Sequence, residues 1–74
     1  MSEHALAVLG SNIRARRKEL SLTQEELADL AGLDRSYMGG VERGERNITV
    51  LTLCKICAAL SCDLAMVSRG LRCA

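Results

Sequence analysis

The chain has 74 residues, of which 49% are hydrophobic, with one tyrosine as its single aromatic residue, no proline and a net charge of +1. This length allows one small domain and no second domain for sensing or catalysis. No apolar run approaches the roughly 20 residues that span a bilayer, and no basic-then-apolar signal segment is present. We therefore expect one cytoplasmic domain over residues 1–74, without membrane contact, built from helices around an aliphatic core.

A first helix is expected over residues 2–20. The apolar residues that share one of its faces are Leu6, Leu9, Ile13 and Leu20. Basic residues gather near its end: Arg14, Arg16, Arg17 and Lys18. Two interpretations of this cluster stay open. It is either an ordinary solvated face favoured by the helix dipole or a patch that meets nucleic acid.

A helix-turn-helix is predicted for residues 23–43. Thr23 followed three residues later by Glu26 forms a capping box, in which each side chain accepts a backbone N–H at the helix start. Gly32 is a residue type that ends helices, and Asp34 is a candidate N-cap for the next one. This arrangement delivers the end of one helix into a DNA major groove.

The second helix of the motif carries the main residues that we expect to contact DNA. Arg35 lies in its first turn, opposite Met38 and Val41, and its planar guanidinium matches guanine O6 and N7. Gly39 and Gly40 in mid-helix are costly, so we expect them to allow close approach to DNA. A short helix that frays at these glycines is the alternative. The predicted DNA-contact residues are Gln24, Arg35, Ser36, Tyr37, Gly39, Gly40, Arg43, Arg46 and Asn47.

Four of these residues are expected to position the protein on the DNA backbone. Gln24 is in the first turn of its helix, where an amide and the helix N-terminus can bind a phosphate, although a plain surface glutamine is the alternative. The ring of Tyr37 is expected to pack in the core. Its hydroxyl either contacts a phosphate as well, or core packing is the only role of this residue. Arg46 and Asn47 follow the helix and are expected to grip the backbone or enter a groove.

Two further helices are expected over residues 50–60 and 64–69. Apolar residues cover roughly 220° of the first of them, far more than the ~100° of a one-sided surface helix. A small domain cannot cover so wide an arc, so we expect a second copy of the chain to do so, through residues 50–70. The predicted dimer-interface residues are Val50, Leu51, Cys54, Ala58 and Leu64.

The chain contains four cysteines, Cys54, Cys57, Cys62 and Cys73. The first two form a C-x-x-C inside a predicted helix, without the second knuckle or histidine pair of a structural zinc site. We expect the cysteines to serve as small buried hydrophobic residues, with zinc binding or a redox pair as the minor alternative. No metal and no cofactor are predicted.

The stretch SLTQEELADLAGLDRSYMGGVERGERN (residues 21–47) resembles the helix-turn-helix of phage-repressor-like (Cro/CI, XRE-type) regulators, and the resemblance extends over about residues 9–70. Residues 33–47 are especially similar to the controller proteins of restriction–modification systems. The resemblance implies an all-α, five-helix, lambda-repressor-like domain that dimerises through its last two helices on a palindromic operator. It also implies DNA-surface positions for Gln24, Arg35, Ser36, Tyr37, Arg43, Arg46 and Asn47.

Two internal roles also follow from the resemblance. An arginine and a glutamate at the positions of Arg17 and Glu42 form an ion pair in such proteins, which assigns Arg17 to structure. In activators of the family, exposed acidic residues on the first helix of the motif contact RNA polymerase. Glu25 and Asp29 occupy such positions here.

The expected function is that of a homodimeric transcriptional regulator that binds a palindromic operator in double-stranded DNA, controls its own gene and controls a restriction–modification operon. An antitoxin or another phage-type repressor is the nearest alternative. A protein-interaction module on a helix-turn-helix scaffold is the alternative from a different class. We expect neither enzymatic activity nor a small-molecule ligand, because no catalytic arrangement or phosphate loop is present.

Overall fold

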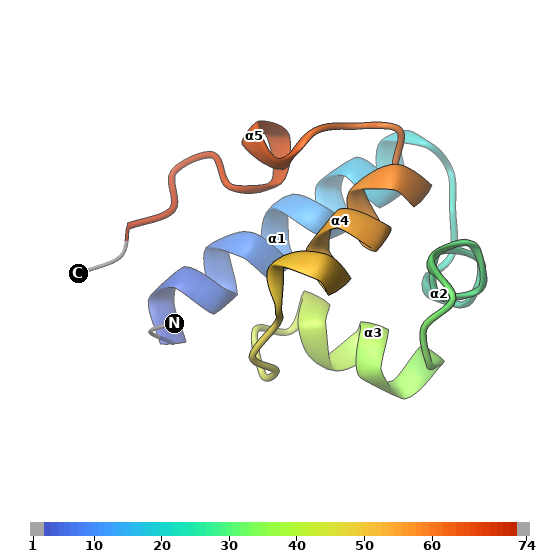
Figure 1. The fold of residues 1–74 in the computed structure, drawn as a ribbon, viewed down its shortest axis with the longest axis horizontal. Helices are drawn as coiled ribbons and strands as arrows, with labels where there is room; N and C mark the ends of the chain where they lie inside the picture. The colour runs from blue at the N-terminus through green and yellow to red at the C-terminus, as the bar shows by residue number, and fades with distance from the viewer. Residues whose placement is uncertain (1–2, 73–74) are drawn as a thin grey trace.

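The computed structural model describes residues 3–72, and within that range it contains five helices and no strand. They are α1 (Glu3–Glu19), α2 (Gln24–Ala31), α3 (Arg35–Glu42), α4 (Val50–Ala59) and α5 (Leu64–Val67). The long helix α1 runs through the domain, with α3 packed on one side and α5 on the other (Figure 1). The all-α, five-helix prediction is confirmed. None of the helices in the described range is long and apolar enough to cross a membrane.

The caps predicted for the helix-turn-helix are all present. Thr23 Oγ1 accepts from the Glu26 backbone N–H at 3.0 Å, and Glu26 Oε1 accepts from the Thr23 N–H at 2.9 Å. Gly32 ends α2 in the left-handed region at φ 69°, where a residue without Cβ is not strained. Asp34 then caps α3 by accepting the Tyr37 N–H at 3.1 Å. These local bonds fix where α2 begins and ends and where α3 begins.

Three helix ends differ from the sequence prediction, of which that of α4, at Ala59 instead of residue 60, differs by one residue. The first helix ends at Glu19, and Leu20 is 37% exposed, so its assignment to the core face was wrong. The chain turns there through Ser21, which has φ 58°. The last helix ends at Val67 instead of residue 69, because Ser68 Oγ donates to the Leu64 carbonyl at 2.8 Å and closes the helix.

The core lies between α1 and the other four helices. Its largest fully buried side chains are Leu9, Ile13, Leu27, Met38, Ile56, Leu60 and Val67. At Gly10, α1 comes so close to α3 that a Cβ would lie 2.6 Å from the Glu42 carbonyl oxygen. Any larger residue at this position would push the two helices apart. Gly10 therefore sets the distance at which α1 supports α3.

Polar side chains of α1 hold the C-terminal third of the chain in place. Asn12 Nδ2 donates to the carbonyls of Val67 at 2.8 Å and Arg69 at 2.9 Å. Arg16 Nε donates to the Leu60 carbonyl at 3.0 Å, at the end of α4. Arg16 therefore caps a helix, a role that neither interpretation of the basic cluster predicted.

Candidate nucleic-acid interface

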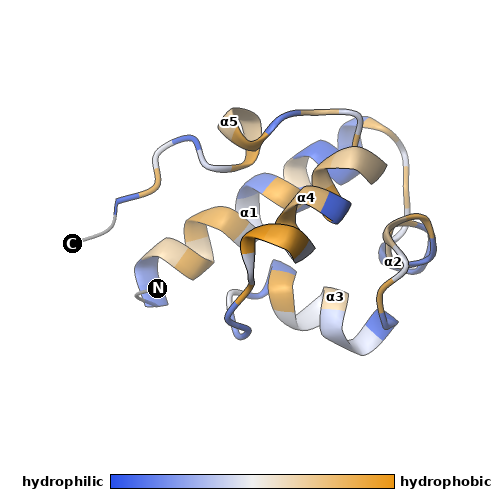
Figure 2. Cartoon of the chain, in the orientation of Figure 1, coloured by the Kyte–Doolittle hydropathy of each residue, from blue (hydrophilic) through white to orange (hydrophobic). Residues whose placement is uncertain are grey.

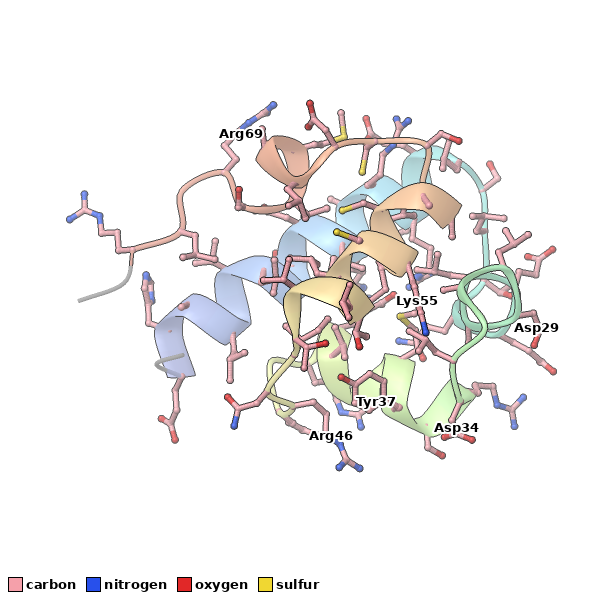
Figure 3. All side chains as sticks on the ribbon, in the orientation of Figure 1. Asp29, Asp34, Tyr37, Arg46, Lys55 and Arg69 are labelled. Carbon is pink, nitrogen blue, oxygen red and sulfur yellow. The ribbon has the colours of Figure 1, made fainter. Side chains whose placement is uncertain are left out.

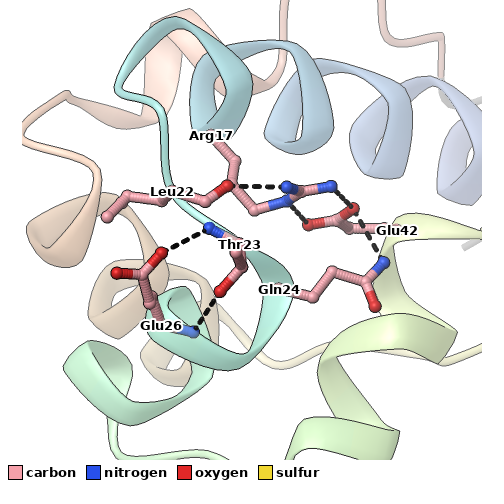
Figure 4. Close-up of polar contacts among 6 residues, drawn as sticks. All are labelled: Arg17, Leu22, Thr23, Gln24, Glu26 and Glu42. Atoms are coloured by element: carbon pink, nitrogen blue, oxygen red, sulfur yellow. Dashed lines mark hydrogen bonds and ion pairs between the residues drawn. The ribbon is translucent and has the colours of Figure 1, made fainter.

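A buried ion pair ties α1 to the last turn of α3. Arg17 Nε donates to Glu42 Oε2 at 2.7 Å and Arg17 Nη2 donates to Glu42 Oε1 at 3.0 Å (Figure 4). The side chains are 10% and 2% exposed, respectively. Arg17 Nη1 also donates to the Leu22 carbonyl at 2.7 Å, so the guanidinium is fully engaged inside the protein. The pair implied by the family resemblance is confirmed.

Gln24 extends this network toward the surface. Its Nε2 donates to Glu42 Oε1 at 3.1 Å (Figure 4). An amide nitrogen carries two hydrogens, so one N–H remains to donate to a ligand. The half-buried Gln24 is therefore not a plain surface glutamine, because the buried pair beneath it fixes its orientation.

Five of the nine predicted DNA-contact residues line one depression of about 300 Å³ between α2 and α3. They come from the first turn of α2 and from successive turns of α3, and are Gln24, Arg35, Ser36, Gly39 and Arg43. Two guanidinium groups, one hydroxyl and one amide converge at this place. Such a set of donors suits an acceptor-rich partner, namely phosphate oxygens or the major-groove edge of guanine.

Arg35 is paired across the motif, which the sequence analysis did not predict. Its Nη1 donates to Glu25 Oε2 at 2.9 Å, and the two side chains are 67% and 63% exposed. An exposed ion pair of this kind contributes about 0–1 kcal/mol. Arg35 can therefore leave Glu25 for a bidentate acceptor at small cost. Arg43 is in the same situation, because its Nε donates to Glu45 Oε1 at 3.1 Å.

The two glycines of α3 lie beneath neighbouring side chains. Both are buried, because other side chains of the same face lie across them. A Cβ on Gly39 would come within 3.0 Å of Arg43 Nη1, and one on Gly40 within 2.8 Å of Arg46 Cγ. That they allow close approach to DNA stays a prediction, whereas the alternative that α3 frays there is wrong, because the helix continues through both glycines to Glu42. They leave room for two arginines to lie flat on the helix.

Tyr37, Arg46 and Asn47 form a second group beside the depression. The ring of Tyr37 packs against the core, and its hydroxyl donates to the Asn47 carbonyl at 3.4 Å. The guanidinium of Arg46 lies over the ring, 6.0 Å from its centroid (Figure 3). A cation at this distance from an aromatic face is attracted to it. Tyr37 therefore orients the loop that follows α3, in addition to filling the core.

A second exposed surface is apolar and lies on α4 and α5. Val50 is 68% exposed, Leu51 77% and Leu64 39%, and Cys54 and Ala58 are also exposed. The first turn of α4 is the most hydrophobic stretch on the visible face of the domain (Figure 2). All five residues predicted for the dimer interface are thus accessible. The apolar stripe predicted on the outer side of this helix is present.

The cysteines have different environments. Cys57 is buried in the core, as predicted, and burial together with neighbouring Cys62 raises the pKa of its thiol to about 12. Cys54 is exposed, so the role of a buried hydrophobic residue is wrong for it in the isolated chain. Cys73 lies outside the described residues. Among residues 3–72, no group of three or more His, Cys, Asp or Glu side chains is arranged to hold a metal ion.

The carboxylate partners of the two interface arginines, Glu25 and Glu45, are not indicated as such by the sequence. Glu45 is two residues from Arg43. This spacing shows that the two residues are close in the chain, but in a loop it does not show whether their side chains point toward each other. Glu25 is ten residues from Arg35, and no helical period links them. The angle between α2 and α3 alone brings these two side chains together.

A five-helix domain that presents a capped helix-turn-helix with arginines on its second helix defines a DNA-binding regulator of transcription. Comparison with known proteins identifies the family. The helix-turn-helix family profile matches residues 13–67, and the chain belongs to this family. The resemblance found in residues 21–47 is therefore confirmed.

Restriction–modification controller proteins are among the similar proteins. Control protein C.SmaI of Serratia marcescens is 46% identical over 54 residues, which cover 73% of this chain and 64% of C.SmaI. The chain thus spans slightly less than two thirds of that relative's length.

Two solved structures extend the comparison. Controller protein C.AhdI of Aeromonas hydrophila has 44% identity and a TM-score of 0.82, and the match covers 84% of this chain and 94% of C.AhdI. The C.Esp1396I tetramer in complex with its natural 35 base-pair operator has 35% identity and a TM-score of 0.79, with coverage of 85% and 83%.

Proposed function

We propose that this protein forms a homodimer through α4 and α5 and binds a palindromic operator, through which it regulates its own gene within a restriction–modification operon. The observation that carries the proposal is the depression in which Gln24, Arg35 and Arg43 converge beside α3. The similarity to C.SmaI and C.AhdI supports the link to restriction–modification. The operator complex of C.Esp1396I supports both DNA binding and self-association. A protein that acts on DNA in this way works in the cytoplasm.

The proposed binding step uses the two groups of the interface differently. Arg35 leaves Glu25 and reads a guanine in the major groove through its two parallel N–H donors. Gln24 and the residues after α3, Arg46 and Asn47, donate to phosphates and set the register of the domain on the duplex. In a dimer, the two copies of α3 enter successive turns of the groove, about 34 Å apart.

The proposal includes a contact with RNA polymerase through α2. Glu25 and Asp29 are both exposed and lie on successive turns of this helix (Figure 3 labels Asp29). Because Glu25 also pairs with Arg35, Asp29 is the cleaner residue to test. Asp29→Lys should reduce activated transcription at least tenfold and leave operator affinity unchanged. Full activation by this variant in a reconstituted promoter assay would remove the contact from the proposal.

The direct test of function is footprinting on the DNA upstream of the protein's own gene. We expect a protected palindrome, with an affinity that falls steeply as salt rises, because phosphate contacts release counterions. A random duplex of the same length is the control, and specific binding should exceed it by about a thousandfold or more. Equal binding to both duplexes would contradict the proposal and favour a protein-interaction module. We propose no enzymatic activity, cofactor or small-molecule ligand.

A further inference from the structure

Two thiols meet where α4 ends, at a place that DNA binding does not use. The helix closes with a Schellman motif: the N–H of Cys62 donates to the Cys57 carbonyl at 3.0 Å, and that of Ser61 to the Ala58 carbonyl at 3.2 Å. Ser61 has the left-handed conformation of this motif, with φ 52°. Side chains at the outer two positions of a Schellman motif are frequently in contact. Here those positions are Cys57 and Cys62, and both side chains line one depression at the end of α4.

The two thiols differ in their access to solvent. Cys57 is 4% exposed, whereas Cys62 is half-buried and packs against the core from outside. Both line a depression of about 530 Å³ at the α4–α5 corner, together with Ala58, Asp63 and Met66. The depression gives a small reagent access to the thiol of Cys62. The buried thiol of Cys57 lines the same depression.

We propose that Cys57 and Cys62 are a redox site that forms an intramolecular disulfide by exchange with a low-molecular-weight disulfide such as oxidised glutathione. None of the residues that line this site is a predicted DNA contact, although Ala58 also belongs to the proposed dimer interface. It also differs from the C-x-x-C that the sequence suggests. Cys54 and Cys57 are three residues apart on a helix, where Cβ atoms lie about 5–6 Å apart. A disulfide needs about 3.5–4.5 Å.

The exchange proceeds in two balanced steps. Cys62 loses its proton to solvent, and its thiolate attacks one sulfur of oxidised glutathione, which releases one glutathione as the thiolate that then takes up a proton. Cys57 next loses its proton and attacks Cys62 Sγ in the mixed disulfide, which releases the second glutathione. Two protein thiols are oxidised to one disulfide, and one glutathione disulfide is reduced to two thiols.

The environment of each thiol sets this order. Burial and the nearby Cys62 raise the pKa of Cys57 to about 12, so at neutral pH Cys57 remains protonated and does not begin the reaction. Once Cys62 is in a mixed disulfide, its sulfur carries no negative charge, so one of the causes that raise the pKa of Cys57 is gone, while burial remains. The disulfide closes a short loop, and such a bond stabilises the fold little and stays reducible by a thiol pool.

The test uses the full-length protein and mass spectrometry. Trypsin cleaves after Lys55 and Arg69, so Cys57 and Cys62 fall in one peptide, residues 56–69, and the other two cysteines fall outside it. After incubation with oxidised glutathione and alkylation of free thiols, this peptide should lack both alkyl groups and two hydrogen atoms. Reduced glutathione should restore both thiols. The rate should rise with pH, because the thiolate is the attacking species.

Variants separate the proposed pair from accidental oxidation. Cys54→Ser/Cys73→Ser should form the disulfide at the wild-type rate. Cys62→Ser should form none within residues 56–69, and circular dichroism should show that it is folded. A disulfide that includes Cys54, a covalent dimer as the main product, or glutathione adducts without ring closure would each overturn the proposal. Loss of the preference for Cys57–Cys62 in denaturant would support it, because only the folded turn pairs these thiols.

Discussion

The α2–α3 surface and the α4–α5 surface of this domain differ in whether their exposed groups have partners within the chain. On the α2–α3 surface, each of the exposed cations Arg35 and Arg43 has a carboxylate partner within the chain. On the α4–α5 surface, Val50 and Leu51 remain 68% and 77% exposed. A surface ion pair is weak and exchanges readily. The arginines of the α2–α3 surface are therefore paired in the free protein and can still leave their carboxylates to bind DNA. Apolar area is satisfied only by burial, so the second surface requires a partner.

The largest expected effect comes from placing a charge on the apolar surface. In a two-fold dimer Leu51→Glu acts twice, and losing two buried leucine contacts costs about 3–6 kcal/mol of dimerisation free energy. The variant should remain folded and sediment as a monomer at tens of micromolar. Leu30→Glu is the matched control, because Leu30 is 63% exposed on α2, outside the proposed interface. A monomeric wild type under the same conditions would contradict the proposed partner.

The next largest effect is expected for the buried ion pair between Arg17 and Glu42. Glu42→Ala leaves Arg17 buried without its carboxylate, which costs on the order of 3–5 kcal/mol of unfolding free energy. Denaturant unfolding should show this loss. Glu45→Ala is the control, because it breaks an exposed pair and should change stability by about 0.5 kcal/mol or less. Equal midpoints for both variants would mean that burial does not distinguish the two pairs.

A smaller effect is expected where the polar surface reads DNA. Arg35→Ala should lose about 1–3 kcal/mol of discrimination at one base position in each half-site. Gln24→Ala should weaken binding to all sequences similarly, because its contact is to phosphate. Operators selected from random DNA with wild type and with each variant give the measurement. If the Arg35→Ala protein selects the same bases as wild type, then another residue reads the sequence.

The smallest effect concerns the glycines that lie under the arginines. Gly40→Ala gains about 1 kcal/mol of helix propensity but displaces Arg46, whose Cγ lies 2.8 Å from the added Cβ. Operator affinity should fall severalfold while thermal stability changes little. Gly39→Ala meets only the mobile end of Arg43, at 3.0 Å from Nη1, and should weaken binding less. The reverse order in a gel-shift titration would refute the proposed role of Gly40.

Several features were predictable because they depend on residues close together in the chain. The capping box of Thr23 and Glu26, the stop at Gly32 and the cap at Asp34 are all made by bonds between residues three or four positions apart. The wide apolar arc of residues 50–60 also follows from helical period alone. Such features need no knowledge of the fold, because the helix itself brings these positions together.

Other features came from family resemblance or were not predicted. The Arg17–Glu42 pair spans 25 residues, and no local pattern indicates it; the resemblance supplied it. The proximity of Cys57 to Cys62 was not predicted, because the C-x-x-C motif draws attention to Cys54 and Cys57. The turn after α4 instead brings Cys62 against Cys57, and only the left-handed Ser61 makes this turn possible.

The sequence by itself determined where the helices of the motif begin and end, which of their faces are apolar, and that one such face exceeds what a small domain can cover. The tertiary structure decided which charges meet. The approach of α1 at Gly10 and the angle between α2 and α3 bring Arg17 to Glu42 and Arg35 to Glu25. Helix periodicity acts along one axis, whereas these contacts depend on the relative placement of separate axes. That placement follows from packing the whole core.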